Sequence, residues 1–388
     1  MSPSAVARKK PGRPAVATPT VAFTAAAHEH TEPAFDVTTT PGAAAVTLGP
    51  FDVPAYGFLR HIFLLCTATG GTLGAGVLST DYPFITFSEV TLLDVNGGQM
   101  FGPYTGYQTF VANKWGAYAF RSDPTLAQDY VATINFTFGM RIPVEILHNN
   151  GLGALANQNA AAAYKVRLGI NASTAMFTTA PTTPPAVRVR GYLEAWSQPT
   201  QADAVGRLQS TVPPAHGTTQ FWTVFNKTLV TGDNVILLPR VGNLIRNIIM
   251  VVRNNASPAI RQVVANEPDP IDVRWDARQL LNESVLLRRQ YMAERISQGI
   301  VEDGVLAYTF THDVLGHAGD GSAELFLPTV QATRLEIHSA NWQVGTVEIL
   351  TNDVAPVEVR PQDRFEETST TGFHPAGTGA YIGGAVNG

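Results

Sequence analysis

One glycine-rich segment has a spacing that a dinucleotide-binding loop could use, namely Gly151-Leu152-Gly153-Ala154-Leu155-Ala156. It follows residues 142–147, an apolar run that could form the strand such a loop requires. However, no acidic residue lies about 20 positions further along to bind a ribose, and no alternation of strands and helices surrounds the segment. We therefore interpret it as a flexible loop between two strands. The chain also lacks a Gly-x-Ser-x-Gly nucleophile elbow and a Gly-Lys-Ser/Thr phosphate loop.

Histidines occur in two pairs that could contribute to metal binding. His28 and His30 lie near the start of the chain, and His312 and His317 flank a segment of glycine and aspartate. A metal site needs three or four ligands that converge on one point, which sequence spacing alone does not supply. Solvated loop histidines are the simpler interpretation.

Three aspartates, Asp269, Asp272 and Asp276, are spaced along a run with strand character. Paired carboxylates can catalyse hydrolysis when they lie about 5–10 Å apart in a cleft. The alternative is a polar rim on a strand that leads into a helix, and we favour this alternative. These residues therefore do not by themselves predict an enzyme.

Cys66 is the only cysteine, so the chain has no internal disulfide and no cysteine-rich zinc site. It ends an apolar run and has no basic neighbours in the sequence that would lower its pKa. We expect a buried, unreactive thiol. The sequence predicts no cofactor and no catalytic or metal-binding residues.

The basic segment Arg8-Lys9-Lys10-Pro11-Gly12-Arg13-Pro14 has two interpretations. An extended Gly-Arg-Pro core could insert into an A·T-rich minor groove, and a basic tail could also contact anionic lipid head groups. The alternative is a solvated tail without a partner. A net charge of −5 argues against general nucleic-acid binding by the whole chain.

Composition favours a β-protein that hides surface against neighbours. Apolar residues make up 45% of the 388 residues, whereas charged residues make up only 15%, against about 25% in an average soluble domain. The 34 glycines and 26 prolines indicate many turns. No window approaches the roughly 18 apolar residues of a membrane span, and no apolar stretch of a secretory leader follows the basic residues near the start.

Short β-type runs fill the middle of the chain, between a flexible arm expected over residues 1–40 and a flexible tail expected over 361–388. Residues 334–338 and 135–138 alternate between polar and apolar, and residues 62–65 and 248–252 are continuously apolar. Apolar spacing from Leu281 predicts one helix, with Asn282 as its N-cap and Gly299 after its end. A shorter helix is expected near residues 107–115.

An internal repeat decides the expected architecture. Residues 53–62 match 238–248 and residues 191–196 match 345–350, while between them 135–138 parallels 308–310 and 166–168 parallels 335–337. Chance similarity between β-rich segments is the alternative. The repeat predicts an all-β protein with minor helix, built as two tandem eight-stranded jelly rolls over residues 41–200 and 201–360. Duplication would superpose Arg60 on Arg246 and Glu194 on Glu348.

Arg60 and Arg246 each open a strongly apolar strand of the repeat. They could anchor an interface or tie the strand to loop carbonyls, and we favour the structural tie. The long loops 70–82 and 149–160 are expected at subunit contacts or on the outer face.

Two tandem units with this Pro–Gly–x–(Leu/Ile)–Arg–(His/Asn)–Ile pattern resemble the double jelly-roll major capsid proteins of tailless icosahedral DNA viruses. The tectivirus-like phages with an internal membrane are the nearest match. The resemblance spans about residues 45–358 and is carried by segments 242–249, 333–336 and 345–352, with 85–92 similar in kind.

The resemblance implies a structural protein of the virion, made in the host cytoplasm, that forms homotrimers and then contacts neighbouring trimers. It also implies penton and minor capsid proteins as partners, with the N-terminal arm meeting membrane lipid or genome inside. Low charge agrees, because interface cores are depleted in charged residues. The alternatives are a virion spike or receptor-binding β-protein, or a glycan-acting enzyme or lectin on paired β-sandwiches.

Overall fold

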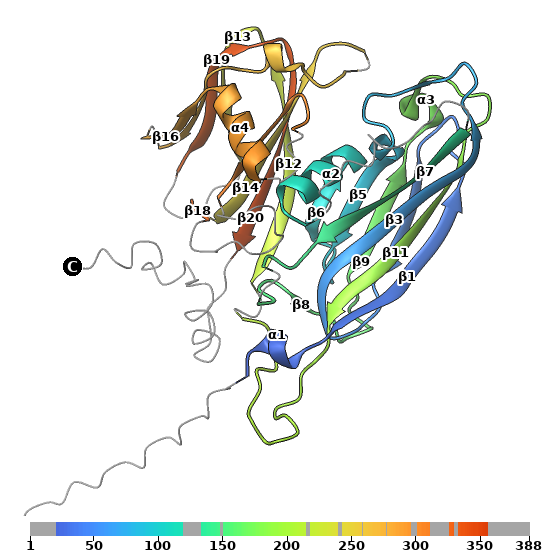
Figure 1. Cartoon of the computed structure of the whole chain (residues 1–388), viewed down its shortest axis with the longest axis vertical. Helices are drawn as coiled ribbons and strands as arrows, with labels where there is room; N and C mark the ends of the chain where they lie inside the picture. Colours follow the sequence, from blue (N-terminus) through green and yellow to red (C-terminus); the bar gives the residue numbers. More distant parts are fainter. Residues whose placement is uncertain are drawn as a thin grey trace, which may run out of the picture.

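The computed structural model describes residues 21–118, 133–147, 150–214, 218–239, 243–257, 259–276, 278–295, 301–310, 326–329 and 333–355. Within these ranges the chain forms two β-sandwiches that lie side by side (Figure 1). We call the sandwich of residues 29–196 the first half and the sandwich of residues 219–355 the second half. The expected all-β fold with minor helix is confirmed.

The first half contains two facing sheets. One has the order β1 (Glu29–Thr39), β11 (Ala186–Trp196), β3 (Phe58–Thr72) and β7 (Thr133–Pro143), with β8 (Leu155–Ala156) beside β3. The other has the order β2 (Val46–Asp52), β9 (Lys165–Ile170), β5 (Phe87–Leu93) and β6 (Gln99–Tyr104). A short ribbon pairs β4 (Val77–Leu78) with β10 (Phe177–Thr179).

The second half repeats this plan. One sheet has the order β12 (Thr219–Leu229), β20 (Gly345–Ala355), β14 (Leu244–Asn254) and β17 (Val305–Thr309), with β18 (Leu327–Pro328) beside β14. The other has the order β13 (Gly232–Leu237), β19 (Leu335–Trp342), β15 (Ile271–Trp275) and β16 (Arg278–Glu283).

The strand order of both halves is that of a jelly roll. If the small strands β4, β8, β10 and β18 are set aside, each half has eight described strands. The first, eighth, third and sixth form one sheet, and the second, seventh, fourth and fifth form the other. This arrangement folds two Greek keys into a closed double sheet. The predicted tandem jelly rolls are confirmed, and so is the duplication of their topology.

Two longer helices occupy equivalent places, since α2 (Gly106–Trp115) and α4 (Val285–Arg295) each follow the fifth strand of their half. The helix predicted near 107–115 is confirmed. The predicted helix from Leu281 begins later, because Leu281 and Asn282 pair with β15 as part of β16. Ser284 caps α4 instead, and its Oγ accepts the N–H of Leu287 at 3.2 Å. Residues 296–299 lie outside the described residues.

The remaining helices are short. They are α1 (Phe23–Ala26), α3 (Ser173–Met176) and the 3-10 helices Phe84–Thr86 and Val264–Asn266. Among the described residues, none of the helices is long and apolar enough to cross a bilayer.

Strand register shows which residues of the two halves correspond. In the first half, Leu59 and His61 face Ala195 and Glu194, so that Arg60 stands at an irregularity between them. In the second half, Ile245 and Asn247 face Asp353 and Asn352, so that Arg246 stands at the same irregularity. The predicted equivalence of Arg60 and Arg246 therefore agrees with the register.

The predicted equivalence of Glu194 and Glu348 is wrong, because the register aligns Glu194 with Asn352. The sequence match of 191–196 with 345–350 is displaced by four residues, and that of 135–138 with 308–310 is displaced by six. Side chains alternate with period two, so an even slip preserves the inward and outward pattern and the sequence does not reveal it. The match of 166–168 with 335–337 falls on equivalent strands, since β9 and β19 are each the seventh of the eight strands of their half.

The flexible arm expected over residues 1–40 is too long. Residues 29–39 form β1, which pairs along its length with β11. Just before it, α1 buries Phe23 edge-on against Phe58 and Trp196. β1 is an edge strand with few buried apolar side chains, so its sequence resembles that of a flexible segment. Its backbone hydrogen bonds to β11 keep it ordered. Residues 1–20 and the expected tail 361–388 lie outside the described residues.

Candidate functional site

Helix α2 lies between the two halves (Figure 1). It contacts β7 and β5 of its own half and β14 of the second half. Thr105 and Gln108 form a capping box: Thr105 Oγ1 accepts the N–H of Gln108 at 3.2 Å and Gln108 Oε1 accepts the N–H of Thr105 at 2.9 Å. All residues of α2 are buried. A helix buried on every side needs a partner on its outer side, and the second half is that partner.

Polar side chains on α2 reach the second half. Tyr107 lies under two guanidinium groups, with Arg261 4.8 Å and Arg253 5.7 Å from its ring centroid. Both arginines also pair with Asp81 of the first half, at 3.0 Å and 2.8 Å. Burial raises the pKa of Tyr107 well above its usual value. The tyrosine therefore stays neutral beneath the two cations.

Gln108 and Lys114 complete this contact. Gln108 Nε2 donates to Glu348 Oε2 at 2.9 Å, and Lys114 forms a buried ion pair with Glu302. A charge that is removed from water is costly unless it is paired. Because these pairs form only when the two halves are correctly placed, they favour the observed position of one half against the other. We call the contact of α2 and its flanking strands with the second half the junction.

An apolar core continues through the junction. Ile249, Val251 and Leu350 of the second half are fully buried in the same cluster as the core of the first half. Trp222 on β12 pairs in parallel with Phe101 on β6, which joins sheets of the two halves into one nine-stranded sheet. Tyr104 Oη also donates to the carbonyl of Thr223 at 2.9 Å. The two halves are therefore one packed body.

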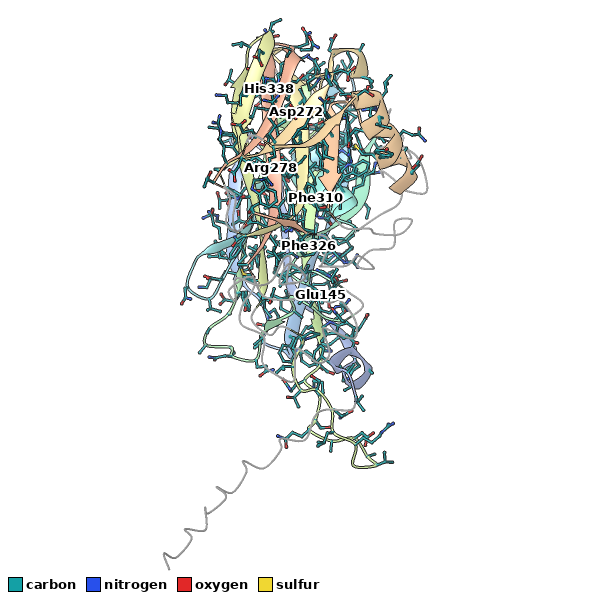
Figure 2. The ribbon with its side chains drawn as sticks, turned by 90° about the vertical axis from the view of Figure 1, so that its left-hand side faces the viewer. Glu145, Asp272, Arg278, Phe310, Phe326 and His338 are labelled. Atoms are coloured by element: carbon teal, nitrogen blue, oxygen red, sulfur yellow. The ribbon has the colours of Figure 1, made fainter. Side chains whose placement is uncertain are left out.

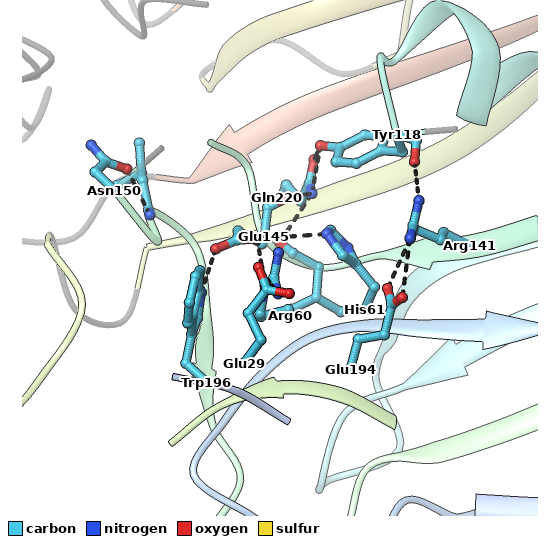
Figure 3. A network of polar contacts seen from close by, with 12 residues as sticks. Glu29, Arg60, His61, Tyr118, Arg141, Glu145, Asn150, Glu194, Trp196 and Gln220 are labelled. Carbon is cyan, nitrogen blue, oxygen red and sulfur yellow. Dashed lines mark hydrogen bonds and ion pairs between the residues drawn. The ribbon is translucent and has the colours of Figure 1, made fainter. Parts of the chain in front are cut away.

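A second polar network lies at one end of the first half, and Glu145 is at its centre (Figure 3). Arg60 Nε and Trp196 Nε1 donate to its two oxygens at 3.0 Å and 2.7 Å. Arg60 also pairs with Glu29 at 3.1 Å and stacks on the Trp196 ring at 4.2 Å. Arg60 therefore ties its strand to two carboxylates, whereas the expected partners were loop carbonyls.

Arg246 is fully buried and has a different partner. Its Nη1 donates to Tyr118 Oη at 3.0 Å, and its guanidinium lies 5.0 Å from the tyrosine ring centroid. Tyr118 in turn bonds to Gln220 of β12. This arginine links a residue just after α2 to the second half.

Residues 151–154 of the glycine segment form a buried structural turn, which corrects the expected flexible loop. Gly151 and Gly153 have φ of 79° and 86°, a conformation that favours glycine, and Leu152 bridges back to Leu147. A Cβ on Gly151 would lie 3.1 Å from Phe23, so the turn also makes room for α1. The following residues pair with β3 as strand β8. A dinucleotide loop would require a helix there.

The candidate metal ligands serve structural contacts. His28 bonds to Ser197 Oγ at 2.9 Å, and His30 stacks on Tyr56 with 3.8 Å between ring centroids. Their place in an ordered strand region corrects the expected position in a flexible arm. His312 and His317 lie outside the described residues. Among the described residues, no three His, Cys, Asp or Glu side chains are grouped to hold a metal ion.

The three aspartates have separate roles. Asp269 accepts the N–H of Val285 at the start of α4, and Asp272 on β15 binds Arg274. Asp272 lies beside His338 on the next strand, as Figure 2 shows. Asp276, at φ 46°, accepts bonds from Thr333 and Arg334, which lower its pKa. Asp269 thus binds the start of α4 and Asp276 binds the residues that precede β19, whereas Asp272 binds a side chain of its own strand.

Cys66 lies in the core of the first half and is fully buried. Burial raises the pKa of its thiol well above the usual value. The predicted unreactive thiol agrees with this environment. The basic segment 8–14 lies outside the described residues.

No family model matches this chain, and no curated protein matches it. Solved structures do match along nearly their whole length. The structure of Sulfolobus turreted icosahedral virus includes a chain with a TM-score of 0.58 at 12% identity, covering 92% of this chain and 97% of that chain. This chain has the double jelly-roll fold. The major capsid protein of bacteriophage PM2 matches with a TM-score of 0.52 at 10% identity, covering 86% of this chain and 99% of that chain. A chain of the PBCV-1 virus capsid gives 0.52 at 10%, covering 84% and 93%.

Proposed function

We propose that this chain is the major capsid protein of an icosahedral virus, a structural subunit without enzymatic activity that resides in the virion. The observation that carries the proposal is the match of 84–92% of this chain, which includes both jelly rolls, to 93–99% of the length of chains from viral capsids. Fusion of two jelly rolls by a buried junction gives a rigid tile, which suits closed symmetric assembly.

The environment of the polar residues supports a structural role. Both carboxylate oxygens of Glu145 accept hydrogen bonds, from Arg60 and Trp196. A carboxylate committed to such bonds holds segments of the chain together. Low charge over the whole chain supports burial of lateral surface in a shell.

The assembly unit is, in this proposal, a homotrimer that contacts neighbouring trimers, penton proteins and minor capsid proteins. The N-terminal arm, shortened to residues 1–20, contacts lipid or genome on the inner face. The assignment to a tectivirus-like phage belongs to the proposal as well. Its support is the motif pattern of the sequence, since similar structures come from three different viruses.

Sedimentation equilibrium of the purified chain over a broad concentration range tests the proposal. We expect a mass three times that of the single chain, and shell-like particles in electron micrographs of concentrated samples. A monomer at every concentration, together with no assembly, would overturn it.

A further inference from the structure

The connection between the two halves forms a hairpin that projects from one end of the molecule. Residues 200–210 follow β11 and precede β12, and Ala202 pairs with Leu208 across the hairpin. We call residues 200–210 the base hairpin. In Figure 1 and in Figure 2 it extends beyond the ends of the strands, on the side where α1 lies. It therefore lies at the end of the molecule where the described chain begins.

The base hairpin is bonded to the first described residue. The N–H of Val21 donates to the carbonyl of Leu208 at 3.1 Å, and the N–H of Ser210 donates to the carbonyl of Val21 at 2.9 Å. The 20 residues that precede Val21 include no acidic residue and four basic ones: Arg8, Lys9, Lys10 and Arg13. The chain thus attaches a strongly basic segment directly to the stem of the hairpin.

One aspartate holds the tip of the base hairpin. Asp203 Oδ1 accepts the N–H groups of Val205 at 3.0 Å and of Arg207 at 2.8 Å. The carbonyl of Asp203 accepts the N–H of Gly206 at 3.0 Å. An N–H group that leaves water is costly unless it is hydrogen-bonded. Since these three consecutive groups are already bonded within the hairpin, the tip can leave water without unpaired donors.

The tip presents an aliphatic side chain and a cation. Val205 is 77% exposed, more than any other large apolar side chain in the described part of the chain. The side chain of Arg207 is 67% exposed, whereas that of its ion-pair partner Asp203 is 17% exposed. The hydrogen bond from Arg207 lowers the pKa of Asp203, so the carboxylate stays ionised and the pair stays intact. The pair therefore turns its positive member toward the surroundings.

An apolar tip beside exposed cations fits the surface of an anionic lipid bilayer. Aliphatic side chains are favourable at the boundary between head groups and acyl chains, and basic residues near the surface gain from its negative potential. The phosphates of a nucleic acid would also attract the basic residues, but phosphate contacts do not account for an exposed aliphatic tip. The combination of features at the base hairpin therefore favours lipid over genome.

We propose that the base hairpin inserts its tip, Val205, into the head-group region of an anionic lipid bilayer, and that the basic residues of the arm bind the same surface. The inference rests on the proposed function and deepens it. It selects lipid as the partner of the inner face and names the hairpin as a contact in addition to the arm.

Assembly strengthens this contact. One valine buries little area, so a single copy binds weakly. A homotrimer places three equivalent hairpins at one height along its axis. After the first hairpin meets the bilayer, the others meet it at a high effective concentration. The contact therefore favours assembled subunits over free ones.

The first test measures co-sedimentation of the full chain with vesicles of phosphatidylcholine and phosphatidylglycerol in equal amounts. Vesicles of phosphatidylcholine alone and a DNA duplex serve as alternative partners. We expect binding to the anionic vesicles, and we expect Val205→Asp to weaken it about 10-fold or more, because a carboxylate is unfavourable at the acyl boundary and at a negative surface.

The matched control is Val230→Asp. Val230 is 61% exposed and directly follows β12, at the end of that strand remote from the base hairpin. We expect this variant to bind the anionic vesicles as the unmodified chain does. Circular dichroism checks that both variants are folded.

The second test reports the surroundings of the tip directly. The variants Val205→Cys and Val230→Cys are labelled with an environment-sensitive maleimide dye; Cys66 is fully buried and does not compete. With anionic vesicles present, we expect the emission of the label at position 205 to shift to shorter wavelength, and the emission of the label at position 230 to stay unchanged.

The outcomes separate this inference from the proposed function. The lipid contact is wrong if the unmodified chain does not bind anionic vesicles, if Val205→Asp binds them equally well, or if the label at position 205 stays in water. Binding to the DNA duplex without binding to vesicles would also overturn it, in favour of genome. A chain that forms trimers keeps the capsid proposal in each of these cases, whereas a monomer that does not assemble would overturn the proposed function itself.

Discussion

Arg60 and Arg246 stand at the same irregularity of two equivalent strands, yet their guanidinium groups bind different partners. Arg60 binds the buried carboxylate of Glu145, whereas Arg246 donates to the phenol of Tyr118 and lies over its ring. Two guanidinium nitrogens of Arg246 have no hydrogen-bond partner among the described residues. Duplication thus preserved the arginine while its surroundings diverged.

This difference predicts unequal costs of removal. Arg60→Met removes the guanidinium that binds the buried carboxylate of Glu145, so we expect a loss of about 3–5 kcal/mol in the free energy of unfolding. Arg246→Met removes a buried cation without stranding a carboxylate bound to it, so we expect a loss below about 2 kcal/mol. Urea unfolding at one fixed protomer concentration measures both. Equal losses would contradict the assigned roles.

The ion pair of Lys114 and Glu302 should show the same physics at the junction. Lys114→Met leaves Glu302 buried and unpaired, and we expect a loss of about 3–5 kcal/mol in unfolding free energy. Adding Glu302→Gln should recover most of that loss, because no buried charge remains. A double-mutant cycle measures the coupling. Additive effects would show that the two side chains do not interact.

The turn held by Asp276 should make stability depend on pH. Bonds from the Thr333 side chain and from the backbone of Thr333 and Arg334 lower the pKa of Asp276 in the folded chain. Its ionised form therefore adds stability above the unfolded pKa of about 3.9, and this stability is lost as pH falls through the lower folded value. We expect Asp276→Asn to reduce Tm at pH 7.

Acid should remove the difference between Asp276→Asn and the unmodified chain, because both side chains are then neutral. Asp52→Asn is the control, since Asp52 is exposed and 3.7 Å from Lys165, and exposed pairs contribute little. Thermal unfolding of all three proteins from pH 7 to pH 2 tests this. A Tm gap that persists at the lowest pH would contradict the role of the charge.

Truncation should locate the true start of the first half. Deleting residues 1–20 leaves the contacts of α1 and β1 in place, so we expect an unchanged unfolding transition. Deleting residues 1–40 removes Phe23 from its cluster and exposes the edge of β11, so we expect aggregation. Light scattering and circular dichroism distinguish the results. A folded, soluble product of the longer deletion would return β1 to the status of a dispensable arm.

Local pattern alone determined the class of fold. Tandem jelly rolls were predicted from the alternation at Leu335 and Ile337, the apolar runs at 62–65 and 248–252, and the order of the repeated segments. Such patterns are informative because the spacing of apolar residues along a strand shows which of its faces is buried. The sequence also predicted the helix α2, near residues 107–115. These features depend on residues close together in the chain.

Tertiary structure decided everything that depends on distant partners. The register of β11 against β3 and of β20 against β14 corrected the match of Glu194 from Glu348 to Asn352, since an even slip leaves the local pattern unchanged. The sequence marked Arg60 and Arg246 as alike. Only packing between segments far apart in the chain placed one against Glu145 and the other against Tyr118, because a buried cation takes its partner from whichever strand lies across from it.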